Sequence, residues 1–159
     1  MPRLLTSVAS GLGKTTELTY QSSVELMLAA AKAGKPWTST TPSPMRVVTK
    51  KVDRDHLEIV GRPAGVYTTE YTYRNPSYDG RQREFRGFEE ATVRTLGDAN
   101  SPTSLVRSRF LLGTCRDDVS TDGVDPCAVS ERWRDNGREA LKGLPATEDA
   151  FDEAGKYLS

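Results

Sequence analysis

The sequence predicts a mainly β protein built of antiparallel β-hairpins that form a sheet. One short helix is expected at about residues 22–33, and a short helical connector at about residues 131–142. Two observations lead to this fold class. Thr, Val and Tyr are abundant, and these residue types favour strands. Apolar and polar residues also alternate with a period of two in several stretches, and turn-forming residues separate those stretches.

The apolar residues are too few for an ordinary core. Leu, Ile, Val and Phe together make up less than a fifth of the 159 residues. A domain of this mass buries roughly 70% of the surface that its unfolded chain exposes, so the shortage points to disorder or to neighbours outside the sequence. Disorder also needs a high net charge, whereas 22 Lys and Arg balance 22 Asp and Glu. We therefore expect a piece of a longer polypeptide, marginally stable or prone to edge-to-edge association by itself.

The charge balance and the hydropathy pattern exclude several kinds of partner. A formal net charge of zero and a pI near 6.6 leave no basic face for nucleic acid. The most apolar stretch, residues 24–33, contains Glu25 and Lys32 and is too short to span a bilayer. The N-terminal residues lack the apolar segment of a secretory signal. Any export signal is therefore expected outside this chain.

The first elements in the chain are a hairpin and the helix. Alternating residues over 3–9 and 14–21 flank a glycine-rich turn, which predicts two paired strands. Ser22 and Glu25 have the spacing of a capping box, and good helix formers follow them. Gly34 then stands where a helix commonly ends.

The remaining strands follow from the same alternation and are expected at residues 47–52, 66–74, 82–95 and 105–112. Asp79-Gly80 is a strong hairpin signal, because Asp tolerates and Gly readily adopts a positive φ. The second of these strands should therefore fold back on the third. Strict alternation places Phe85 and Phe88 on opposite faces of this hairpin, so both faces need cover.

Two short motifs resemble nucleotide-binding sequences but fit strands better. The run from Gly11 to Thr16 ends like a phosphate-binding loop, yet such a loop needs a glycine where Val8 stands and a helix after it. Arg86-Gly87-Phe88 begins like an RNA-binding strand, but Glu89 and Glu90 follow and would repel nucleic acid. We interpret the first as a hairpin turn and the second as a strand that packs on a neighbour.

Residues that could carry chemistry are few. Cys115 and Cys127 are the two cysteines, and they either close a disulfide in an oxidising compartment or stay as separate thiols. A structural zinc site needs two more ligands, and His56 is the one histidine. We therefore expect no metal and no cofactor. An enzymatic alternative would have to use carboxylates such as Glu84 and Asp79.

One set of motifs is similar to a known family. Tyr71-Thr72-Tyr73 precedes Tyr78-Asp79-Gly80, and Glu84-Phe85-Arg86-Gly87-Phe88 follows. Over nearly its whole length the chain resembles the middle/N-terminal module of the B component of bacterial insecticidal toxin complexes, the TcdB or TcB type. The module also occurs in SpvB-like and Rhs-related proteins. The resemblance gives these structural motif residues: Tyr78, Asp79, Gly80, Glu84, Phe85, Arg86, Gly87 and Phe88.

This resemblance implies a scaffold and not an enzyme. Family members are long β-rich chains in which a β-propeller and Rhs-type sheets join a C component to enclose a toxic effector, which an A component translocates. The expected function is a non-catalytic module that links the propeller to the Rhs-type sheets. It would be cytoplasmic before release and then secreted as part of the toxin complex. Two alternatives stay open: a segment of an SpvB-like enzyme toxin, and a cell-surface adhesion or recognition module.

The resemblance also divides the chain into three parts. Residues 1–114 correspond to the toxin β module, and residues 115–145 form an acidic loop and connector. Residues 146–159 are expected to begin the next module, because Phe151-Asp152 followed by Gly155 resembles a degenerate YD repeat.

Overall fold

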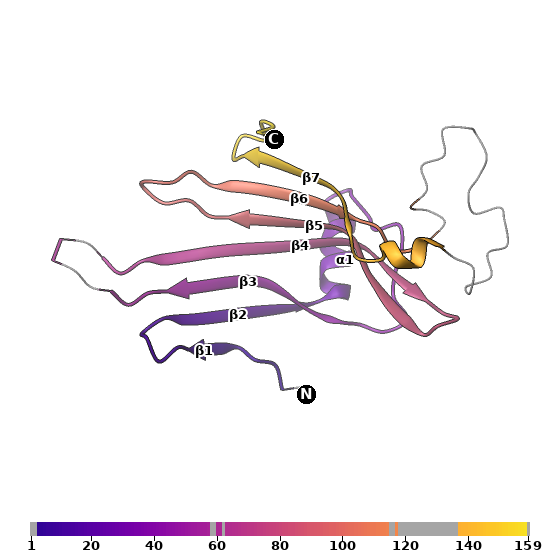
Figure 1. Cartoon of the computed structure of the whole chain (residues 1–159), viewed down its shortest axis with the longest axis horizontal. Coiled ribbons are helices and arrows are strands. Elements are labelled where there is room, and N and C mark those ends of the chain that lie inside the picture. Colours follow the sequence, from indigo (N-terminus) through magenta and orange to yellow (C-terminus); the bar gives the residue numbers. More distant parts are fainter. Residues whose placement is uncertain (1–2, 58–59, 62, 115–116, 118–136, 159) are drawn as a thin grey trace.

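A single antiparallel sheet of seven strands makes up the chain, and each strand pairs with the next one in sequence (Figure 1). The computed structural model describes residues 3–57, 60–61, 63–114, 117 and 137–158. The prediction of a mainly β fold with one short helix is confirmed. The strands are β1 (Ser7–Ala9), β2 (Thr15–Ser22), β3 (Arg46–Arg54), β4 (Val66–Asp79), β5 (Glu84–Thr95), β6 (Ser104–Phe110) and β7 (Pro145–Asp152).

The glycine-rich run near the N-terminus is a hairpin turn, as expected. Strand β1 pairs with β2, with Val8 opposite Thr16. The amide of Ser10 donates to the carbonyl of Lys14 at 2.8 Å and closes the turn. A strand and not a helix follows, so no helix N-terminus is present here to hold a phosphate.

Helix α1 (Ser23–Lys32) begins with the predicted capping box. The Ser22 hydroxyl accepts a hydrogen bond from the amide of Val24, and the Glu25 carboxylate accepts one from the amide of Ser22 at 2.7 Å. These bonds satisfy amides that have no partner inside the helix. The buried side chain of Ser23 also accepts from the amide of Met45 at 3.1 Å, which fixes the helix against the segment that leads into β3.

The β4–β5 hairpin is the longest in the sheet and extends beyond β3 (Figure 1). Strand β3 pairs with β4 only from Val66 to Glu70. Past that point the chain after α1 covers the edge of β4. The amide of Thr38 donates to the Asn75 side chain, and the Ser39 hydroxyl donates to the carbonyl of Pro76 at 2.7 Å. Pro76 is fully buried and lies opposite Phe88 of β5. On its other side β3 does not pair with β4, so no bond to β3 requires an N–H donor at this position.

The turn of this hairpin differs from the prediction. Strands β4 and β5 do pair, but four residues, 80–83, connect them. Gly80 does not adopt a positive φ, and Arg83 takes the left-handed position with φ of 55°. Longer hairpin loops usually contain a type I turn, whose central residues have negative φ, so the left-handed residue comes at the end of the loop. The expectation for Gly80 was therefore wrong.

The placement of Phe85 and Phe88 on opposite faces was also wrong. Their ring centroids lie 5.5 Å apart in an edge contact, so both rings are on one side of β5. Tyr78 is opposite Phe85 while Ser77 is opposite Gly87, so Arg86 is an extra residue in the ladder. This bulge shifts the alternation by one position, and Gly87 with φ of 114° makes it possible.

Strand β7 completes the sheet after the short 3-10 helix η3 (Gly137–Leu141). It pairs with β6, with Leu105 opposite Phe151. Helical structure over 137–141 agrees with the predicted connector at 131–142, and the rest of that prediction lies outside the described residues. After β7 the chain turns back, and Tyr157 bridges to Phe151. Strand β7 belongs to the same sheet as the strands before it. The start of a new module at residue 146 therefore stays a prediction.

The described residues contain no buried hydrophobic side chain of the kind that forms a core. Buried positions are instead polar, charged, glycine or proline: Ser23, Asp53, Pro76, Arg86, Ser108 and Gly113. This agrees with the shortage of apolar residues in the sequence. Neither helix in the described ranges has the length and the apolar character that crossing a bilayer requires.

Candidate functional site

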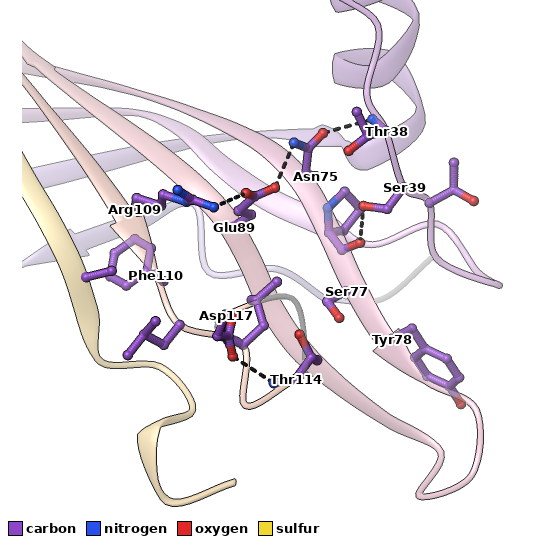
Figure 2. A pocket seen from close by; sticks show the side chains of 15 residues that line it. Thr38, Ser39, Asn75, Ser77, Tyr78, Glu89, Arg109, Phe110, Thr114 and Asp117 are labelled. Atoms are coloured by element: carbon purple, nitrogen blue, oxygen red, sulfur yellow. Dashed lines mark hydrogen bonds and ion pairs between the residues drawn. The ribbon is translucent and has the colours of Figure 1, made fainter. Parts of the chain in front are cut away.

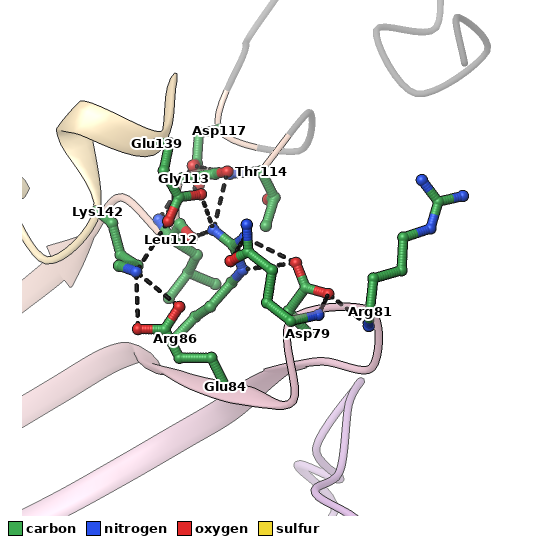
Figure 3. Close-up of polar contacts among 11 residues, drawn as sticks. Asp79, Arg81, Glu84, Arg86, Leu112, Gly113, Thr114, Asp117, Glu139 and Lys142 are labelled. Carbon is green, nitrogen blue, oxygen red and sulfur yellow. Dashed lines mark hydrogen bonds and ion pairs between the residues drawn. The ribbon is translucent and has the colours of Figure 1, made fainter. Parts of the chain in front are cut away.

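A network of charged side chains joins the end of the β4–β5 hairpin to the segment before β7 (Figure 3). The hairpin contributes a buried arginine and its carboxylate partner from the predicted motif. Residues 137–144, which we call the strap, cross over this end and contribute charges of both signs. We call the set the hairpin-tip network, and its members are Asp79, Gln82, Glu84, Arg86, Glu139 and Lys142.

Arg86 is the centre of the hairpin-tip network. Its side chain is only 4% exposed, and every nitrogen of its guanidinium donates a hydrogen bond. Toward the hairpin turn it binds the Asp79 carboxylate at 2.7 and 3.2 Å and the Gln82 side chain at 3.1 Å. Toward the strap it binds the Glu139 carboxylate at 2.7 Å. The carbonyls of Leu112 and Gly113 accept from it at 3.2 Å each.

This bonding lets a full charge lie inside the protein. Burial by itself lowers the pKa of Arg86, but the hydrogen bonds to Asp79 and Glu139 outweigh it and raise that pKa overall. The guanidinium therefore stays charged, and its planar fork suits several acceptors at once. An unpaired charge at such a position would be costly. The arrangement fits a structural role that links the hairpin to the strap, because the guanidinium N–H groups of Arg86 are already bound within the protein.

Asp79 stabilises the turn and Arg86 at the same time. One carboxylate oxygen accepts from the amides of Arg81 and Gln82 at 2.8 and 3.1 Å, and the other accepts from Arg86. The bond from the Gln82 amide, followed by that from Arg86, lowers the pKa of Asp79 below its ordinary value. Aspartate is therefore needed here for its charge and for its short reach to the backbone.

The strap is fastened by a second ion pair. The ammonium of Lys142 donates to both oxygens of Glu84 at 2.9 and 2.8 Å and to Glu139 at 2.8 Å. Hydrogen bonds from Lys142 and then from Arg86 lower the pKa of Glu139, and those to Glu139 and Glu84 raise the pKa of Lys142. Both carboxylates thus bind cations of the network.

A smaller cluster lies between β2 and β3. Asp53 is buried, accepts a hydrogen bond from the Thr16 hydroxyl at 2.5 Å, and pairs with Lys51 and Lys14 at 3.1 and 3.2 Å. The Thr16 hydroxyl is the main reason that the pKa of Asp53 falls to about 2, with the two lysines adding to it against the effect of burial. Next to this cluster, the Thr15 hydroxyl lies 2.7 Å from a ring nitrogen of His56.

A cavity of about 390 Å³ lies beside the hairpin, between the chain after α1 and the end of β6 (Figure 2). Glu89 accepts from the Asn75 side chain at 2.9 Å and pairs with Arg109 at 3.1 Å on one wall. Phe110 lines another wall. The cavity is thus lined by Glu89, which is already paired with Arg109, and by Asp117, whose carboxylate accepts hydrogen bonds from the amides of Leu112 and Thr114.

The eight predicted motif residues all lie at this hairpin, on two of its faces. Asp79, Glu84 and Arg86 meet in the network, while Phe85 and Phe88 are on the side opposite Arg86. Sequence reasoning missed Glu139 and Lys142 as members of the network, because they lie more than fifty residues away from their partners in the hairpin. No group of three or more possible metal ligands occurs within the described ranges. The proposed pair Cys115 and Cys127 falls outside those ranges.

Comparison with known proteins identifies the family. The family model for the middle/N-terminal region of the insecticide toxin TcdB matches residues 1–111, well over half of the chain. The chain belongs to this TcdB middle/N-terminal family. The motif hairpin and the strands on both sides of it lie inside the matched region. The search of curated proteins found no match.

Solved toxin structures share the fold of this TcdB-type module. A Tc holotoxin pore from Photorhabdus luminescens is 20% identical, with a TM-score of 0.68 over 95% of this chain. The TcdB2-TccC3-TEV structure is 18% identical over 94% of the chain with a TM-score of 0.70, and TcdB2-TccC3 is 20% identical over 89% with 0.62. The chain spans only 8% of each of those polypeptides. The likeness therefore establishes the fold of one small part of such toxins.

Proposed function

We propose that this chain is a non-catalytic structural module of a secreted toxin complex of the TcdB type. In this role it links a β-propeller to Rhs-type sheets in the B component and helps to build the shell that carries a toxic effector. Its partners are the other domains of the same long chain together with the C and A components. We also propose that residues 1–114 form the module proper, with a connector at 115–145 and the next module from 146.

The use of the carboxylates supports a structural role. Glu84 and Asp79 were the acids that an enzyme would have used, and each is bound by a cation of the hairpin-tip network. The bonds around Asp79 hold it ionised, so it does not serve as a general acid near neutral pH.

The missing core is the observation that carries the proposal. A sheet of seven strands without a buried hydrophobic side chain in its described part has little to stabilise it alone. Large apolar side chains such as Leu5, Val66 and Tyr67 are exposed. Such a sheet is suited to packing against other parts of a larger assembly. The similar solved structures of TcdB2 together with TccC3 support a C component as one partner.

Thermal unfolding and size-exclusion chromatography of the 159-residue chain test the proposal. We expect a broad, low-temperature transition and association that increases with concentration, because exposed strand edges pair with one another. Val8→Lys on the outer strand β1 should reduce the association. Leu12→Lys, in the adjacent turn and even more exposed, is the matched control and should not. A sharp, high-melting transition of a monomer would contradict the proposal.

The enzymatic alternative has its own test. We expect Glu84→Gln to lower the melting temperature, because Lys142 loses its main carboxylate partner. A hydrolytic or transferase activity of the chain that disappears in this variant, while the variant stays folded, would favour the enzyme instead.

A further inference from the structure

The tip of the β4–β5 hairpin presents two aromatic rings to solvent. Tyr78 and Phe85 are direct cross-strand partners, so both side chains lie on the same face of the hairpin. They are 37% and 38% exposed, although they lie next to the buried hairpin-tip network. The tip projects past the end of β3 (Figure 1), so among the described residues no strand on that side of β4 reaches these rings.

The opposite face of the tip is fixed. Asp79 and Glu84 are also cross-strand partners, and they are bound by Arg86 and Lys142 on the face that the strap covers. The Phe85 ring in addition contacts Phe88. Phe88 in turn contacts Trp37 and Tyr73, at centroid distances of 6.0 and 5.0 Å. Phe85 therefore forms the outer end of a row of contacting aromatic side chains, so it has little conformational freedom left to lose on binding.

The charge of the tip is defined as well. Its two carboxylates, Asp79 and Glu84, are neutralised within the network. Arg83, the last residue of the turn, is exposed and held in a left-handed backbone conformation with φ of 55°. Arg81 of the same turn is exposed as well. The accessible tip thus combines two aromatic rings with cationic side chains. Tyr, Phe and Arg are enriched at the centres of protein interfaces.

We propose that this aromatic tip, formed by Tyr78, Arg83 and Phe85, is a docking site for another polypeptide surface. The complementary surface is an apolar groove with a carboxylate at its rim, which accepts the two rings and pairs with Arg83. It belongs to polypeptide outside these 159 residues. The inference depends on the geometry of the hairpin and stands independently of the toxin-complex role.

Binding of synthetic peptides to the full chain tests the docking site. The probe is a fluorescent peptide composed of leucine, phenylalanine and glutamate, and its control has lysine in place of glutamate. We expect the acidic peptide to bind at least ten times more tightly. The chain has no net charge, so such a preference reports local charge and not a general attraction. Binding should weaken as salt concentration rises.

Three variants locate the binding. The double variant Tyr78→Ser/Phe85→Ser should weaken binding of the acidic peptide at least tenfold. Arg83→Gln, which changes an exposed side chain of the turn, should weaken it about threefold and reduce the salt dependence. This variant keeps the test valid if the double variant unfolds. Leu12→Ser, which removes a 96% exposed apolar side chain from another turn, should leave binding unchanged.

Several results would overturn the proposal. The first is that the acidic peptide does not bind, and the second is that the lysine peptide binds equally well. The third is that Leu12→Ser lowers the affinity for the acidic peptide as much as the tip variants do. Binding of phosphatidylserine vesicles that depends on the same three residues, without peptide binding, would assign the tip to a membrane surface instead. Circular dichroism of each variant confirms that the strand signal is kept.

Discussion

The carboxylate of Asp79 holds the guanidinium of Arg86 across the end of the β4–β5 hairpin, with bonds of 2.7 and 3.2 Å. The same carboxylate binds two amides of the turn, so the turn and the buried charge depend on one side chain. Arg86 then reaches Glu139 in the strap. A contact between residues seven apart thus positions a segment that is more than fifty residues further along the chain.

Replacing Arg86 with lysine should destabilise the protein although the charge is kept. Lysine lacks the planar fork that serves Asp79, Glu139 and two carbonyls together. We expect a loss of about 1–3 kcal/mol in the free energy of unfolding, measured by urea denaturation. Arg94→Lys is the matched control: its guanidinium pairs with Glu70 at the surface and should cost less than about 0.5 kcal/mol. Equal effects of the two substitutions would show that Arg86 is not the centre of the network.

Two glycines of the hairpin should respond in opposite ways to alanine. Gly87 has φ of 114° at the bulge, so Gly87→Ala should lower the free energy of unfolding by about 1–2 kcal/mol. Gly80 has no positive φ and no atom within 4 Å of an added Cβ, so Gly80→Ala should be neutral or stabilise by up to about 1 kcal/mol. Chemical denaturation of both variants measures the difference. Similar losses in both would contradict the observed turn.

Asp53 should make the protein acid-sensitive in a defined range. Its pKa is about 2 in the folded protein against 3.8 as the ordinary value, so its charged form is favoured by folding. The stability it provides is complete above about pH 4 and is lost as the pH falls toward 2, which amounts to about 2 kcal/mol. Asp53→Asn should remove this part of the pH dependence of unfolding. Thr16→Val should raise the Asp53 pKa in an NMR titration, and an unchanged pKa would show that the hydroxyl has no such role.

The strap should loosen when Glu139 loses its charge. Glu139→Gln weakens the pairs with both Arg86 and Lys142, so amide hydrogen exchange should accelerate in residues 137–144 and in β7. Amides of β2 and β3 should keep their protection. Glu153→Gln removes an exposed partner of Arg94 and serves as the control. Uniform acceleration over the whole sheet would mean that the strap and β7 do not open separately.

Local patterns in the sequence were sufficient for most of the fold. Alternation identified the strands from β1 to β6 but not β7, and the Ser22 and Glu25 spacing predicted the start of α1. The errors came from single backbone conformations. The bulge at Gly87 brought Phe85 and Phe88 to one side, and the left-handed residue of the turn was Arg83 instead of Gly80. Neither can be derived from alternation, because one inserted residue reverses every side chain beyond it.

The candidate site was predictable only in part for a different reason. The motif residues of the hairpin are close in sequence, so their grouping could be expected. Glu139 and Lys142 approach the hairpin only because η3 leads into β7 beside β6. Charged residues at a surface turn and charged residues in a network look the same in a sequence, and only the tertiary pairing of distant segments separates them.

Strand order along the sheet follows chain order from β1 to β7, and this affects how the protein is assembled. Each strand from β2 onward pairs with the strand before it, so most pairings close a short loop. The two exceptions are the connection from β2 to β3, which contains α1, and the connection from β6 to β7. The sheet can therefore grow from the N-terminus while the rest of the polypeptide is still being synthesised. The last strand joins late, after a long connection, and the ion pairs of the strap then act as the closing step of folding.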